Sequence, residues 1–112
     1  MGEDIRSPLQ QFREIEAQLQ LLMSGLPLEI AGVPTRKPAE LIHRTLEQTH
    51  KLLKDYESEE DLQLQAYLLP TAVKQLELLR KQVLDASQYN VFSAIDVAQL
   101  SAELDQLIER LG

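Results

Sequence analysis

The sequence predicts an all-helical fold, a four-helix bundle, on three observations. Leucine supplies 22 and glutamine 12 of the 112 residues, while glycine supplies only 4. Aromatic residues make up 4% of the chain and β-branched residues are few, which is typical of helices rather than strands. Apolar residues also recur at helical spacing in four segments. We expect a chain of this length to form one domain, residues 1–112, of which residues 1–7 could be disordered.

The first predicted helix covers residues 8–23 and is followed by a long connection. Ser7 can cap the helix, Pro8 suits its first position, and Gln10 can complete a capping box. Residues 24–37 contain two prolines and two glycines, which break regular structure. The connection also carries apolar side chains that need burial, namely Leu26, Leu28, Ile30 and Val33. We therefore expect it to form an ordered cap over the bundle.

The second and fourth predicted helices have clear start signals. The second opens at Pro38 and runs to about residue 56. The fourth covers residues 94–111, because Ser93 and Asp96 form a capping pair before it and a glycine follows it.

The third predicted helix, residues 59–87, begins in an acidic segment, where negative charge suits the helix dipole. Pro70 lies inside this helix and removes one backbone donor. We therefore expect a kink or a break near residues 66–69.

This third helix is apolar on two sides. One broad face carries the residues expected in the core, which are Leu62, Ala66, Leu69, Ala72, Val73, Leu76, Leu79, Val83 and Leu84. Three apolar residues lie nearly opposite that face, namely Leu64, Tyr67 and Leu78. Either residues 24–37 or another helix covers this second side, or the three residues form a dimer or partner-binding surface.

The formal charge of −7 disfavours bulk attraction to nucleic acid or to an anionic membrane. Five of the eleven basic residues nevertheless fall within one short stretch, namely Arg36, Lys37, Arg44, Lys51 and Lys54. This basic strip is a candidate contact for an acidic partner, with Arg44 and Lys51 at its centre. Internal charge balance is the alternative, because residues 55–61 reverse the sign. No aromatic rings interleave with the strip, so a nucleic-acid groove is not expected.

Several classes of chemistry have no support in the sequence. The absence of cysteine excludes disulfides and thiolate zinc sites. His43 and His50 each follow a glutamate by three residues, but a solvated polar face explains this pattern better than a metal site does. No glycine-rich phosphate loop and no Gly-x-Ser-x-Gly elbow occur. We expect no metal, no cofactor and no small-molecule substrate.

One stretch resembles a known family. Residues 80–111 contain the run from Ser101 to Asp105, which matches four of the five positions of a Ser-Gln-Glu-Leu-Asp motif. This motif is the hallmark of the sporulation-type aspartyl-phosphate phosphatases, which are two-helix hairpins acting on response regulators. The resemblance implies that Asp105 is the essential acidic group, with Ser101 and Glu103 as its motif partners. Ala102 stands where the family has an amide side chain.

Two functions follow as expectations. The first is a small cytoplasmic helical module that binds another protein, or itself as a homodimer, without catalysis of its own. The second is a phosphatase-like regulator that acts on the aspartyl-phosphate of a response regulator. The cytoplasm is expected because the chain begins with an acidic segment rather than a secretory signal and carries no long apolar stretch.

Overall fold

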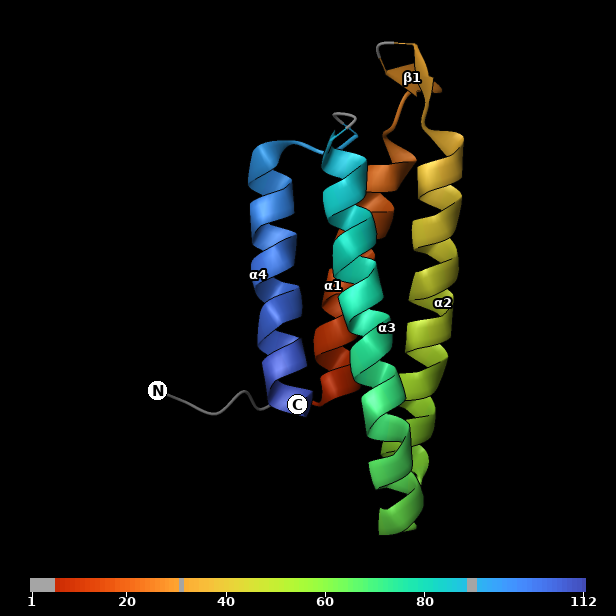
Figure 1. The fold of residues 1–112 in the computed structure, drawn as a ribbon, viewed down its shortest axis with the longest axis vertical. Coiled ribbons are helices and arrows are strands. Elements are labelled where there is room, and N and C mark those ends of the chain that lie inside the picture. Colours follow the sequence, from red (N-terminus) through yellow and green to blue (C-terminus); the bar gives the residue numbers. More distant parts are fainter. Residues whose placement is uncertain (1–5, 31, 89–90) are drawn as a thin grey trace.

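The computed structural model of the protein describes residues 6–30, 32–88 and 91–112. Within them the chain forms four α-helices, namely α1 (Pro8–Ser24), α2 (Arg36–Ser58), α3 (Leu62–Gln88) and α4 (Ala94–Leu111). Consecutive helices run in opposite directions (Figure 1), and each packs against its neighbours in the order α1, α2, α3, α4 and back to α1. The predictions of a helical fold and of four helices are confirmed.

The starts of α1 and α4 follow the predicted capping signals. The Ser7 hydroxyl accepts the Gln10 backbone N–H at 3.2 Å, and the Gln10 side chain accepts the Ser7 backbone N–H at 3.2 Å. The Ser93 hydroxyl accepts the Asp96 backbone N–H at 3.1 Å. Each pair satisfies donors that a helix start leaves free. The expectation of disorder over residues 1–7 falls mostly on residues outside the described part, but Ser7 is ordered by this cap.

The start of α3 differs from its predicted position at residue 59. The Asp61 carboxylate accepts the Gln63 backbone N–H at 2.8 Å, so it caps a helix that begins at Leu62. Glu59 has an extended backbone after the end of α2. Several acidic residues in a row offered more than one possible cap, and Asp61 is the one that is used.

Pro70 lies inside α3 and is exposed to solvent. The helix continues through it from Leu62 to Gln88. The prediction of a break near residues 66–69 is therefore wrong, whereas the kink expected there stays a prediction.

The connection between α1 and α2 contains a short hairpin, β1 (Glu29–Ile30) paired antiparallel with β2 (Val33–Pro34). The hairpin extends beyond the ends of α1 and α2 (Figure 1). Leu26 packs against the core, but Leu28 is 87% exposed. The expected burial of Leu28 is therefore wrong, because the hairpin leads the chain away from the helices. The side chain of Val33 lies outside the described part of the structure.

The core lies between the four helices. Its largest fully buried side chains are Phe12, Ile15, Leu19, Ile42, Leu46, Leu53, Leu76, Leu79, Val83, Leu100, Leu104 and Leu107. α2 and α3 continue past the ends of α1 and α4 (Figure 1), and no residue from 54 to 71 is buried. We call residues 54–71 the tip.

The core stripe predicted on the third helix is therefore buried only along the part of α3 that lies beside α1 and α4. Ala72, Leu76, Leu79 and Val83 are buried, whereas Leu62 in the tip is 78% exposed. Leu84, which lies at the edge of the stripe, is exposed as well.

Candidate functional site

The three predicted contact residues of α3 lie on the same side of the helix and are exposed to solvent. Leu64, Tyr67 and Leu78 are 52%, 77% and 41% exposed. At 100° per residue they occupy a sector of roughly 60°. No element of the described chain covers them, because α3 packs against α2 and α4 through its other sides. The interpretation that residues 24–37 or another helix covers them is therefore wrong.

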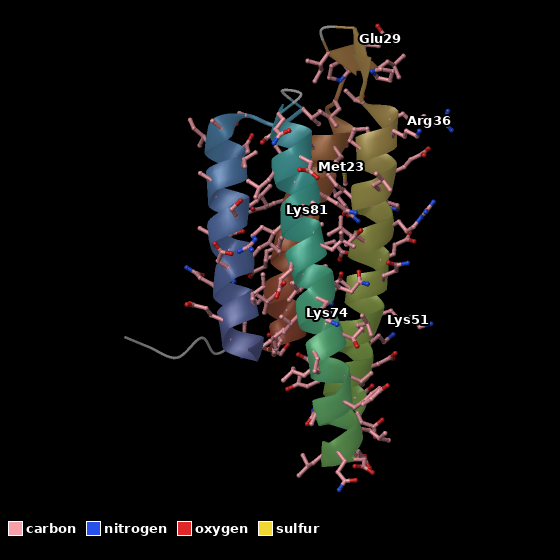
Figure 2. All side chains as sticks on the ribbon, in the orientation of Figure 1. Met23, Glu29, Arg36, Lys51, Lys74 and Lys81 are labelled. Carbon is pink, nitrogen blue, oxygen red and sulfur yellow. The ribbon has the colours of Figure 1, made fainter. Side chains whose placement is uncertain are left out.

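Two lysines share this side of the helix. Tyr67, Lys74 and Lys81 follow one another at intervals of seven residues, which places them on one helix face. Lys74 and Lys81 are exposed and lie on α3 with α1 behind it (Figure 2). We call Leu64, Tyr67, Lys74, Leu78 and Lys81 the outward face of α3. Sequence reasoning missed the two lysines, although their seven-residue spacing from Tyr67 could have found them.

The tip is strongly acidic. Its carboxylates are Asp55, Glu57, Glu59, Glu60 and Asp61. No lysine, arginine or histidine occurs between Lys54 and Lys74. Glu57 accepts the Leu9 backbone N–H at 2.9 Å and so caps the start of α1. The chain is therefore strongly acidic just before α3 begins, whereas the later part of α3 carries charges of both signs, namely Lys74, Arg80 and Lys81 beside Glu77 and Asp85.

The basic strip of α2 lies on a different surface. Arg44 lines a groove between α1 and α2, beside Met23 and His43. Lys51 projects from the side of α2 away from α3 (Figure 2). The structure therefore does not bring Arg44 and Lys51 together with Leu64, Tyr67 and Leu78. The spacing of the basic residues in the sequence could not show this, because it does not say which side of α2 packs against α3.

The motif residues of α4 are divided between two edges of the helix. Asp105 accepts a hydrogen bond from Arg80 of α3, and the two groups form an ion pair. Ser101 lies one turn before Asp105 and so shares the edge that faces α3. Glu103 shares the opposite edge with Arg110, which donates to Gln11 of α1 at 2.9 Å.

Two of these motif residues have a buried polar atom that lacks a hydrogen-bond partner. The Ser101 hydroxyl and one carboxylate oxygen of Glu103 are shielded from solvent and have no hydrogen-bond partner in the described structure. Because the two side chains face different helices, these atoms do not form one site. The arrangement brings Ser101, Asp105 and Arg80 together and leaves Glu103 apart.

The histidines form separate polar pairs. His50 Nδ1 lies 3.2 Å from a carboxylate oxygen of Glu16 on α1, and His43 Nε2 lies 3.1 Å from Glu47 on its own helix. The contact between His50 and Glu16 joins two helices and was not predictable from local spacing. Across residues 6–30, 32–88 and 91–112, no three His, Asp or Glu side chains converge to hold a metal ion.

None of the described helices is long and apolar enough to cross a membrane. Comparisons with protein-family models, curated proteins and solved structures found no match to this chain. The function is therefore inferred from the residues and their placement alone.

Proposed function

We propose that this protein is a small acidic interaction module of the cytoplasm that binds a protein partner through the outward face of α3. The observation that carries the proposal is the exposure of Leu64, Tyr67 and Leu78 on one side of α3, whose other side is buried from Ala72 onward. Such a group of apolar side chains loses contact with water only when a partner covers it.

The composition of the face supports a protein partner. Tyrosine is enriched among the residues that dominate interface energetics, because it combines a large apolar ring with a polar group. Lys74 and Lys81 flank the apolar residues and would form a polar rim. The kink predicted near residues 66–69 lies in the middle of this face, where it would set the angle between the tip and the rest of α3.

Site-specific photo-crosslinking tests this function. A photoreactive phenylalanine analogue replaces Tyr67 in one variant and Ile95 in a control. Ile95 is an exposed residue of α4, on another helix. We expect a defined protein adduct from position 67 in living cells and none from position 95. Leu78→Ala should then weaken binding of the identified partner in a purified system. Equal adducts from both positions, or none from position 67, would contradict the proposal.

A second candidate function is a phosphatase-like regulator of an aspartyl-phosphate. The pairing of Asp105 with Arg80, beside Ser101, favours it. In that reaction Asp105 would orient the water that attacks phosphorus, and the Arg80 guanidinium would contact phosphoryl oxygens. The position of Glu103 on the other edge of α4 speaks against a complete motif, so this function ranks second.

Phosphate release separates the two functions. Phosphorylated response regulators of the source organism are incubated with the wild-type protein and with Asp105→Asn. The regulator function predicts a shorter phosphate lifetime with the wild type only. Unchanged lifetimes with both proteins would exclude it and leave the interaction function as proposed.

A further inference from the structure

We propose that the partner at the outward face of α3 is a second copy of this chain, which packs its own α3 antiparallel against the first. This inference rests on the proposed function and adds the identity of the partner. The contact would have twofold symmetry, with the axis beside Pro70 and Thr71 in the middle of the face.

The charge distribution along α3 favours this arrangement. The tip carries five carboxylates and one lysine, whereas residues 72–88 of α3 carry three basic side chains, Lys74, Arg80 and Lys81, and two acidic ones, Glu77 and Asp85. Within the described structure, the side chains of Lys74, Lys81 and Glu60 form no hydrogen bond and no ion pair. All three residues are exposed. The tip, with a net charge of −4, is therefore complementary to residues 72–88 of a second copy, which have a net charge of +1.

The register follows from the position of the axis. With the twofold axis between residues 70 and 71, Tyr67 lies opposite Lys74 of the second copy, where the ammonium group can contact the ring face. Glu60, two residues before the start of α3, then lies near Lys81 of the second copy. Twofold symmetry repeats both contacts, and the contact closes on itself rather than extending into a fibre.

A parallel contact between two copies is disfavoured by the same charges. It would place the five carboxylates of one tip against those of the other, which is repulsive. It would also place Lys74 on Lys74 and Lys81 on Lys81. The antiparallel arrangement instead places each acidic tip beside residues 72–88 of the other copy, where basic residues outnumber acidic ones.

The size of the face sets the expected strength. With the axis between residues 70 and 71, residues 62–79 of the two α3 helices lie opposite one another, which is about 27 Å of helix. A contact about 10 Å wide therefore buries roughly 550 Å² in total from two copies. This lies below the usual range for stable protein complexes. We therefore expect a dissociation constant of about micromolar order or weaker, and a marked dependence on salt, because the ion pairs are exposed.

Charge reversal with complementation tests the inference on the full-length chain. Sedimentation velocity over a range of concentrations measures the dimerisation of the wild type, Glu60→Lys and Lys81→Glu. Each variant places like charges opposite one another twice, so we expect dimerisation to weaken about tenfold. An equimolar mixture of the two variants restores both attractive pairs in a heterodimer, and its affinity should return to that of the wild type.

Two matched controls carry the same charge changes elsewhere. Lys51→Glu lies on the side of α2 away from α3, and Glu109→Lys lies on an exposed part of α4. Both should dimerise as the wild type does. Circular dichroism should show unchanged helix content for all variants, because every substituted side chain is exposed.

The outcomes separate the inference from the proposed function. A wild type that stays monomeric at all concentrations overturns the inference, as does a mixture no tighter than either variant alone. If the chain is monomeric but position 67 crosslinks to a different protein, the proposed function holds and self-association is wrong. A monomer without any adduct at position 67 overturns both.

Discussion

Leu78 and Leu79 are neighbours in the sequence but belong to different sides of α3. Leu79 is fully buried among the four helices, whereas Leu78 is exposed to solvent. The same residue type therefore serves the stability of the fold at one position and, in our proposal, contact with a partner at the next. The rotation of about 100° per residue separates the two roles. A count of leucines cannot distinguish them, because only the placement of α2 and α4 decides which side is covered.

The two ends of α3 differ in a related way. Residues 72–86 pack against α2 and α4. Residues 62–71 lie beyond the ends of α1 and α4, so neither of these two helices covers them (Figure 1). The difference arises because α2 and α3 have 23 and 27 residues, while α1 and α4 have 17 and 18. We therefore expect the core contacts in the second half of α3 to contribute most to the stability of the fold. The rest of its surface is available for contact with a partner.

The largest expected effect comes from the two neighbouring leucines. Leu79→Ala should lower the free energy of unfolding by about 2–5 kcal/mol, because it leaves a cavity in the core. Leu78→Ala should change it by less than about 0.5 kcal/mol. Chemical unfolding followed by circular dichroism, at a protein concentration where the chain is monomeric, measures both. Equal losses for the two variants would show that the two sides of α3 are not distinct.

A second prediction concerns Pro70, which lies between the two ends of α3. Pro70→Ala should raise the free energy of unfolding by about 1–3 kcal/mol, because proline removes a helix hydrogen bond and its side chain here is exposed. Thermal and chemical unfolding measure the change. A destabilised variant would mean that the ring of Pro70 contributes contacts that alanine does not replace.

The smallest expected effect concerns the edge of α3 that faces α4. A double-mutant cycle with Arg80→Ala and Asp105→Ala should give a coupling of about 0.2–1 kcal/mol, since both side chains are partly exposed to solvent. Unfolding of the wild type, the two single variants and the double variant supplies the four free energies. A coupling well above this range would show that the pair fixes the position of α4 on α3.

Local signals in the sequence predicted much of the fold, and tertiary contacts decided the rest. The caps at Ser7 and Ser93 placed the starts of α1 and α4, because a cap acts within one turn of helix. The predicted start of α3 was wrong because several neighbouring carboxylates are each able to cap the helix. The exposure of Leu62 was not predictable, since it depends on where two other helices end.

The candidate site shows the same division. Leu64, Tyr67 and Leu78 follow from helical periodicity alone, and the structure places all three on one exposed face. Arg44 and Lys51 were predicted as contact residues from the clustering of basic residues, and they lie on α2, away from the outward face of α3. To predict which residues of different helices share one surface, the order in which the helices pack must be known, and the sequence does not give that order.

Distance measurement by electron paramagnetic resonance tests the self-association of α3 most directly. The chain has no cysteine, so Thr71→Cys supplies a single attachment point for a spin label beside the proposed axis. Packed helix axes lie about 8–10 Å apart, and we therefore expect a distance below roughly 25 Å between the labels of two copies. A label at Ile95→Cys should give no such distance. The absence of dipolar coupling from position 71, at concentrations up to the millimolar range, would contradict the antiparallel contact.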